Sequence, residues 1–321
     1  MAEEVKYSAD ADKPNQDEFS ETLQRLAETD TSIIAVTSDS RGSGKLVPFG
    51  KKFPKQIVEV GIAEQNLVGV AAGLASCGKK VFAVSPACFL TARSLEQIKN
   101  DICYSNNAAT VVGISAGVSY GALGSTHHSL HDFAVLRAIN NIIIVAPADN
   151  FETQQATELA AASDVPVYLR FGKKIMPALK KDNSDGFAFG KGRIITTGDD
   201  IAIIANGETV QPAIQAAEKL QANGIAATVI SMHTIKPLDT TLISSLAKKC
   251  KAVITVEEHS VYGGLGEAVA SFLMQEGIAK PFKIMGIPDE YTVTGPQMDI
   301  FKHYGISGEG IAAEAIRLLN R

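Results

Sequence analysis

The chain has 321 residues, of which 45% are hydrophobic, so it is long enough for two domains with separate cores. Its formal net charge is −5 with acids and bases mixed along the sequence, which argues against nucleic acid or a membrane surface as the main partner. The apolar runs are too short to span a bilayer, and residues 1–18 contain no apolar signal core, so we expect a cytoplasmic protein.

The first half of the chain alternates short β-branched runs with helical patterns. We expect strands over 32–39, 80–86, 110–116, 142–147 and 165–171. We expect helices over 64–76, 92–105 and 151–163. Strands that are apolar throughout and alternate with helices are typical of a parallel sheet that is covered on both faces.

The rhythm breaks over 172–199, where Lys, Asp and Gly are frequent, and then resumes. Strands are expected over 201–207, 226–232, 252–258 and 282–288, and helices over 209–224, 265–275 and 310–320. The sequence therefore predicts two α/β domains, each a mainly parallel sheet flanked by helices. The predicted division is a flexible N-terminus over 1–15, a first domain over 16–175, a linker over 176–198 with at most a short hairpin, and a second domain over 199–321.

The four cysteines show no pairing or metal-ligand spacing. Cys77, Cys88, Cys103 and Cys250 are far apart in sequence and form no CxxC pair. We expect reduced, mostly buried thiols and no metal site made by this chain alone.

Ligands of open parallel sheets bind beyond the carboxyl ends of the strands, where this sequence has four candidate loops: 39–45, 86–91, 117–132 and 171–174. The third, "AGVSYGALGSTHHSLHD", holds His127, His128 and His131, and histidine exchanges protons readily near neutral pH. The HHxxH spacing does not favour a helical zinc site. Capping of the loop backbone remains the alternative for these histidines.

The stretch "IVEVGIAEQNLVGVAAGLASCG" raises a separate question. Its apolar residues recur at helical spacing, yet Glu64 lies among them. A carboxylate beside a buried apolar surface is unfavourable unless it is paired, so Glu64 is expected to have a partner or a role.

Several longer motifs occur in a fixed order: "VGIAEQNLVGVAAGLA", "FLTARSLEQIKNDICYSN", "GSTHHSLHDFAVLRAINNIIIVAPAD" and "VPVYLRFGK". Together they resemble the pyrimidine-binding domain of transketolases. The later motifs "VISMHTIKPLD" and "VITVEEHSVYGGLGEAV" resemble the C-terminal domain of that family. The resemblance covers about residues 20–321 and corresponds to the second half of a full-length transketolase.

The resemblance implies the C-terminal subunit of a split, thiamine-diphosphate-dependent transketolase. The GDG signature, with its downstream Asn, that holds magnesium and diphosphate in this family is missing here. It is expected on an N-terminal partner subunit, with which this chain would form an α2β2 heterotetramer. Glu64 matches the glutamate that hydrogen bonds to N1′ of the aminopyrimidine, Phe89 an aromatic that flanks this ring, and Asp39 an acid near the cofactor and the subunit interface.

The resemblance also implies residues that bind the sugar substrate. His127 matches a histidine that contacts the donor's C1 hydroxyl or the cofactor-bound intermediate, with His128 beside it. Arg170 matches an arginine that clamps the substrate phosphate, a task that suits the guanidinium fork. His259 in "EEHSVYGG" is expected to be structural.

Four positions depart from the family pattern. Ser115 and Leu123 stand where a histidine and an aspartate bind the donor, Gln16 falls where an arginine helps to hold phosphate, and Ala92 replaces a stacking aromatic. We therefore expect ketol transfer on an atypical set of sugars, phosphorylated or otherwise anionic. From their positions alone, Arg41 or Lys45 is a candidate for the missing cation.

Two other functions remain open. One is another enzyme of the superfamily, either a 1-deoxyxylulose-5-phosphate synthase-like protein or the β-subunit of a 2-oxo-acid dehydrogenase. The other is a non-catalytic binding or regulatory subunit that has kept the fold, which the substitutions at Ser115, Leu123 and Ala92 would explain.

Overall fold

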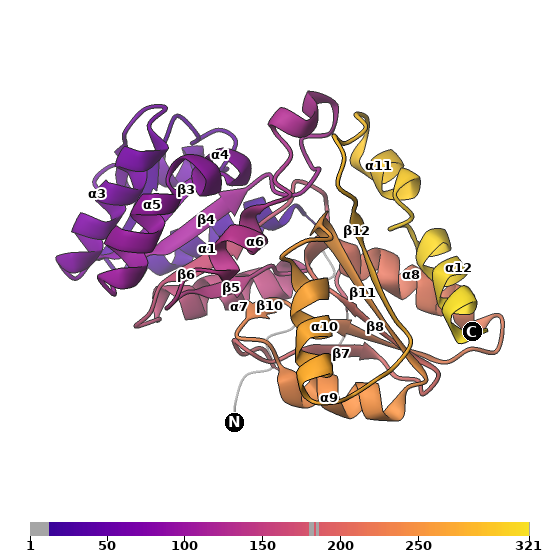
Figure 1. Cartoon of the computed structure of the whole chain (residues 1–321). Coiled ribbons are helices and arrows are strands. Elements are labelled where there is room, and N and C mark those ends of the chain that lie inside the picture. Colours follow the sequence, from indigo (N-terminus) through magenta and orange to yellow (C-terminus); the bar gives the residue numbers. More distant parts are fainter. Residues whose placement is uncertain (1–12, 180–182, 184–185, 321) are drawn as a thin grey trace, which may run out of the picture.

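The structure, a computed structural model, describes residues 13–179, 183 and 186–320. Most of the N-terminus that was expected to be flexible, residues 1–12, lies outside the described residues. Two α/β domains lie side by side, the first in indigo to magenta and the second in orange to yellow (Figure 1). The predicted fold class is confirmed.

The first sheet has seven strands in the order β10-β5-β6-β4-β3-β1-β2. Every neighbouring pair is parallel except β10 and β5. The central strands are buried along their whole length, as their continuous apolar sequences predicted. The strands are β1 (Ile33–Thr37), β2 (Ile57–Glu59), β3 (Lys80–Pro86), β4 (Thr110–Ile114), β5 (Ile143–Val145), β6 (Val167–Arg170) and β10 (Thr234–Lys236).

Helices cover both faces of this sheet. Phe19 and Leu23 of α1 pack on one face with α2 and α7, and Leu67 of α3 and Phe133 of α6 pack on the other with α4 and η1. The helical segments are α1 (Asn15–Thr29), α2 (Val47–Lys52), α3 (Glu64–Ser76), α4 (Ala87–Arg93), α5 (Leu95–Gln97), η1 (Ile98–Tyr104), η2 (Gly121–Thr126), α6 (Asp132–Arg137) and α7 (Asn150–Ala161).

The segment after β3 differs from the prediction. A helix was expected over 92–105 and a loop over 86–91, but α4 begins at Ala87, directly after the strand. Pro86 occupies the N-cap position, where the missing N–H of proline costs no helical hydrogen bond. Phe89 is therefore presented by a helix rather than by a loop.

The second sheet has five strands in the order β12-β11-β8-β9-β7, parallel except for β7. On one face α8 and α12 form the core, and on the other α9 and α10 do. The elements are β7 (Arg193–Thr196), β8 (Ile201–Ala205), η3 (Gly207–Thr209), α8 (Val210–Gln221), β9 (Ala227–Ser231), α9 (Thr240–Lys249), β11 (Ala252–Ser260), α10 (Leu265–Gln275), β12 (Phe282–Ile287), α11 (Gln297–His303) and α12 (Gly308–Leu319). Within the part of the chain that the structure describes, no helix is long and apolar enough to cross a membrane.

Two short strands change the expected division of the chain. The segment 176–198, predicted as a linker, contains β7, which pairs antiparallel with β9 at the edge of the second sheet. Strand β10 lies within the predicted second domain, yet it pairs antiparallel with β5 and completes the edge of the first sheet. The second half of the chain therefore protects an edge strand of the first domain.

A buried ion pair lies where the two domains meet. Oδ2 of Asp132 accepts hydrogen bonds of 2.8 Å from Nε of Arg170 and of 2.8 Å from the hydroxyl of Tyr168. Nη2 of Arg170 donates to the carbonyl of Ser129 at 3.2 Å and, across the domain boundary, to the carbonyl of Glu258 at 2.8 Å. One guanidinium thus connects α6, β6 and β11.

Charge balance in this site depends on Asp132. Burial by itself would raise the pKa of the Asp132 carboxyl, but Arg170 and the hydrogen bonds around it hold that pKa below its usual value. His259, whose Nε2 lies 3.8 Å from Oδ1 of Asp132, has its pKa lowered by burial to about 4 and is neutral at pH 7. A structural position for His259 agrees with the expectation from sequence.

We predict that Asp132→Asn destabilises the chain by about 3–5 kcal/mol, because it leaves the Arg170 charge buried without its counter-ion. Tyr168→Phe, which removes one neutral donor from the same carboxylate, should cost only about 1 kcal/mol. Urea unfolding at pH 7 measures both changes. Equal stability of the two variants would show that the ion pair does not hold this junction together.

Candidate active site

Glu64 is the first residue of α3, and its partner is an arginine. The side chain is buried, at 6% exposed, and Oε1 accepts a hydrogen bond of 2.9 Å from Nη1 of Arg93. The N-terminus of a helix also favours a negative charge. Arg93 is the only side chain among the described residues that hydrogen bonds to this carboxylate, so Oε2 retains capacity for a further donor.

The same arginine leads to an aromatic group. Its guanidinium carbon lies 4.3 Å from the ring centroid of Phe89, in a cation–π contact. The ring of His127 meets Phe89 edge-on at 5.3 Å and Tyr120 edge-on at 5.5 Å, and Nζ of Lys173 lies 4.8 Å from the centroid of Tyr120. We call this series the catalytic row: Glu64, Arg93, Phe89, His127, Tyr120 and Lys173.

The fold explains why these residues meet. The segments that carry the row follow the carboxyl ends of β2, β3, β4 and β6, which are parallel strands of one sheet. Parallel strands bring the loops after them to one edge, where open α/β sheets bind ligands. Three residues expected from sequence, Glu64, Phe89 and His127, therefore lie in one row.

His127 is half-buried and has one nitrogen engaged locally. Its Nδ1 lies 3.0 Å from the hydroxyl of Thr126. No described residue hydrogen bonds to Nε2, so this atom is available to a ligand as a donor or an acceptor.

Ser115 and Gln16 are two of the positions that depart from the family pattern, and they contact each other. Nε2 of Gln16 donates to the hydroxyl of Ser115 at 3.3 Å, and both side chains are buried. Ser115 has a φ of +53°, and it also hydrogen bonds to the hydroxyl of Tyr120. Ser115 therefore supports the catalytic row through Tyr120.

Asp39 lies apart from the row. It is exposed, with a φ of +54°, and its N–H donates to Oε1 of Glu59 at 2.6 Å. Burial opposes the charge on Glu59, but hydrogen bonds from Asp39, Thr37 and Gly61 lower the pKa of that carboxyl overall. No hydrogen bond or ring contact among the described residues joins Asp39 to the row.

Two residues expected to bind substrate are engaged inside the protein instead. Arg170 is 4% exposed, and its Nε and Nη2 are used by Asp132 and by two carbonyls, so it joins the domains and does not present this fork to a phosphate. His128 is buried, with Nδ1 2.6 Å from the hydroxyl of Thr292 and Nε2 3.0 Å from the carbonyl of Gly121. Burial lowers the pKa of His128, which fits a neutral ring that ties its loop to the second domain.

Sequence reasoning missed Arg93, Tyr120 and Lys173. Arg93 and Tyr120 are in the quoted motifs, but nothing in their spacing distinguishes them from solvated surface residues. The motif "FGK" does contain Lys173, immediately after a strand, and this position at a carboxyl end was the one available signal.

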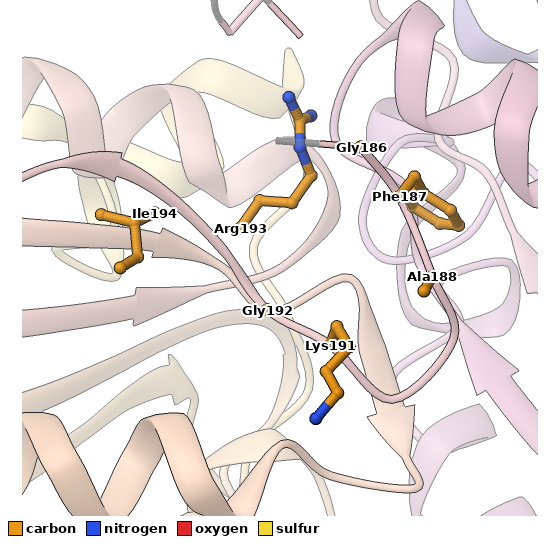
Figure 2. Close-up of a pocket in the computed structure, with 7 residues that line it drawn as sticks. All are labelled: Gly186, Phe187, Ala188, Lys191, Gly192, Arg193 and Ile194. Carbon is orange, nitrogen blue, oxygen red and sulfur yellow. The ribbon is translucent and has the colours of Figure 1, made fainter. Parts of the chain in front are cut away.

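The structure also has a surface hollow of about 490 Å³ along β7, lined by residues 186–188 and 191–194 (Figure 2). No residue of the catalytic row lines it. Over the described ranges, no group of three or more His, Cys, Asp or Glu side chains could hold a metal ion.

Comparison with known proteins assigns both domains. Residues 14–178 match the family model "Transketolase, pyrimidine binding domain", and residues 190–311 match "Transketolase, C-terminal domain". The second match includes β7, in agreement with its place in the second sheet.

The relatives cover nearly the whole chain. It is 47% identical over 303 residues to one of the two kinds of subunit of an apulose-4-phosphate transketolase from Phocaeicola vulgatus, and the match covers 94% of this chain and 96% of that protein. It is 38% identical over 296 residues to "Putative transketolase C-terminal section" of Methanocaldococcus jannaschii, with 92% of each chain covered. A 1-deoxy-D-xylulose-5-phosphate synthase of Halothermothrix orenii is 37% identical over 304 residues, but only 48% of its length is matched.

Among solved structures, "Split gene transketolase, inactive beta4 tetramer" superposes with a TM-score of 0.88 at 34% identity. The match covers 96% of this chain and 99% of that one. Taken together, the two domain matches and the relatives along nearly the full length show that the chain belongs to the transketolase family, as a counterpart of the C-terminal subunits of its split members.

Proposed function

We propose that this chain supplies the aminopyrimidine side of a thiamine diphosphate site that it shares with an N-terminal transketolase subunit. The assembled enzyme would transfer a two-carbon ketol unit from a ketose to an aldose. The single observation that carries the proposal is the buried carboxylate of Glu64, which lies in one row with Phe89 and His127.

These residues fit half of the cofactor. The buried Glu64 carboxylate has an oxygen free to accept an N–H from N1′ of an aminopyrimidine, and the half-buried Phe89 offers an aromatic edge beside it. The described residues contain no cluster suited to a metal, so Mg²⁺ and the diphosphate are assigned to the partner subunit. When bound, thiamine diphosphate supplies a carbon nucleophile and an electron sink for breaking the carbon–carbon bond.

The chain's own residues would bind, orient and move protons. Glu64 would hold a proton at N1′, with Arg93 fixing the orientation of its carboxylate. His127 would contact a donor hydroxyl through Nε2, because this is the one ring nitrogen without a partner among the described residues. Tyr120, held by Ser115, keeps the imidazole in place from its other side.

A cation for an anionic substrate is available at the end of the row. Arg41 and Lys45, considered from sequence, lie 3.4 Å from Glu59 and 3.5 Å from Asp17, and Arg170 is buried. Lys173 is exposed and lies over Tyr120, next to His127. We assign Lys173 to the anionic end of a sugar phosphate, the substrate class in the name of the apulose-4-phosphate transketolase relatives.

The proposed partner and assembly follow from the half-site. A row that offers the pyrimidine side alone needs a second chain for the diphosphate, and an α2β2 heterotetramer provides two such sites. The related split-gene structure, a tetramer of β chains alone, is described as inactive.

Calorimetry tests the shared site directly. Thiamine diphosphate with Mg²⁺ should bind tightly to the mixture of this chain with its N-terminal partner, and not to this chain alone, because each chain holds only half of the cofactor. Tight binding by the single chain would contradict a shared site.

We predict that Glu64→Gln in the reconstituted complex lowers kcat by about 10²–10⁴-fold, because the amide cannot take up the proton. Glu96→Gln, an exposed glutamate nearby in α5, is the matched control and should leave kcat unchanged. Steady-state rates with a ketose phosphate donor measure both. Retained activity of Glu64→Gln would refute the assigned role. Pyruvate as the donor distinguishes the synthase-like alternative.

We predict that Lys173→Ala raises KM for a phosphorylated ketose by about tenfold or more, since one charge-assisted contact is worth about 1.5–3 kcal/mol. KM for the unphosphorylated sugar should not change. Lys219→Ala, on α8 of the second domain, serves as the control for loss of an exposed lysine. An equal rise in KM for both sugars would show that Lys173 does not contact the phosphate.

A further inference from the structure

Two buried carboxyl groups of the second domain lie beneath the catalytic row. Glu208 belongs to η3 and Glu258 to β11, and both are almost inaccessible to solvent. Nε2 of Gln297 donates to Oε2 of Glu208 at 2.6 Å and to Oε1 of Glu258 at 2.8 Å. A single amide nitrogen from α11 therefore bridges the two carboxyls. We call these three residues the carboxyl pair and its bridge.

Each carboxyl also accepts a backbone N–H from a different loop of the first domain. Oε1 of Glu258 accepts from Val118 at 2.8 Å, at the start of the loop that carries Tyr120 and His127. Oε1 of Glu208 accepts from Lys174 at 3.0 Å, directly after Lys173. The two loops that form the substrate end of the row are therefore attached to the same pair.

Glycines allow the loops to approach this closely. A Cβ at Gly117 would lie 2.2 Å from Cδ of Glu258, and a Cβ at Gly172 would lie 2.2 Å from Cδ of Glu208. Gly117 also has a φ of +61°, which disfavours other residues. Both loops thus run in direct contact with the carboxyls.

The surroundings favour a proton on the pair. Burial raises the pKa of Glu258 to about 8, and the negative charge of Glu208 adds to this rise. Burial likewise raises the pKa of Glu208, although Gln297 and Lys174 act against it. Arg170 and Lys174 are the cations that face the pair, and they do not offset the burial of two like charges.

We propose that Glu208 and Glu258, bridged by Gln297, are positioning residues that hold the His127 loop and the Lys173 loop in register for the donor substrate. The pair retains a proton near neutral pH. Its loss places two negative charges beneath both loops, so substrate binding weakens as pH rises further. This inference rests on the proposed function, because that function makes the two loops a substrate site.

The test uses Glu258→Gln, which keeps an oxygen for the Val118 N–H and carries an amide hydrogen in place of the shared proton. In the reconstituted complex, the wild-type KM for a ketose phosphate should rise about tenfold between pH 8 and pH 9, as for one ionisation with a pKa of about 8. The variant should lack this rise, while its Kd for thiamine diphosphate stays within about twofold of wild type, because Glu64 and Phe89 lie on other elements.

Glu257→Gln is the matched control. Glu257 neighbours Glu258 on β11, burial raises its pKa to about 7, and its oxygens accept N–H groups of Leu265 and Gly266. It holds α10 and touches neither loop, so its variant should keep the wild-type rise in KM. If Glu258→Gln also keeps the rise, the positioning role is overturned.

A second measurement separates this inference from the proposed function. Amide hydrogen exchange of the single chain, corrected for intrinsic rates, should show the peptides 117–128 and 171–176 losing protection above pH 8 in wild type but not in Glu258→Gln. That result supports the pair even if the complex transfers no ketol group, which would overturn the proposed function only. Equal loss in both proteins overturns the positioning role. Gln297→Met, in a half-buried position, removes the bridge and should move the loss to higher pH.

Discussion

The ion pair between Asp132 and Arg170 is the interaction on which the arrangement of this protein depends. Arg170 ends β6, Asp132 begins α6, and the same guanidinium reaches the carbonyl of Glu258 in the second domain. A buried ion pair adds little net stability, but removing one partner leaves an uncompensated charge in the interior. The pair therefore specifies how the two domains meet more than it strengthens either of them.

The junction explains why the substrate end of the row is built from both domains. Tyr120, His127 and Lys173 come from the first domain, but their loops are held from below by Glu208, Glu258 and Gln297 of the second. The cofactor end, with Glu64 and Phe89, belongs to the first domain alone. A transketolase C-terminal domain is thus joined to catalysis here through loop placement, without contributing a side chain to the row.

The departures from the family pattern also have a common physical basis. Gln16 and Ser115 hydrogen bond to each other, so an arginine and a histidine position have been replaced together by a neutral, buried contact. Positive charge is supplied instead at the surface, by Arg93 at one end of the row and Lys173 at the other. This pattern argues against a degenerate subunit, because the row stays continuous from Glu64 to Lys173.

The sequence by itself determined the elements and the chemistry at their ends. Continuous apolar runs predicted the buried parallel strands, and the bounds expected for α10 agree with the structure because its apolar spacing is regular. An unexplained acid among apolar residues singled out Glu64. The very short strands β7 and β10 could not be predicted, since three or four residues carry too little pattern and their partners are distant in sequence.

Only the tertiary structure decided which charged residues face solvent and which are buried. Arg170 and Lys173 are close neighbours in one motif, but the first lies within the strand at the domain junction and the second just beyond it. The roles of Arg93 with Glu64 and of Glu258 with Glu208 were likewise set by contacts between segments far apart in the chain. Burial is a property of the packed molecule, because it depends on which distant side chains surround a residue and not on its neighbours in sequence.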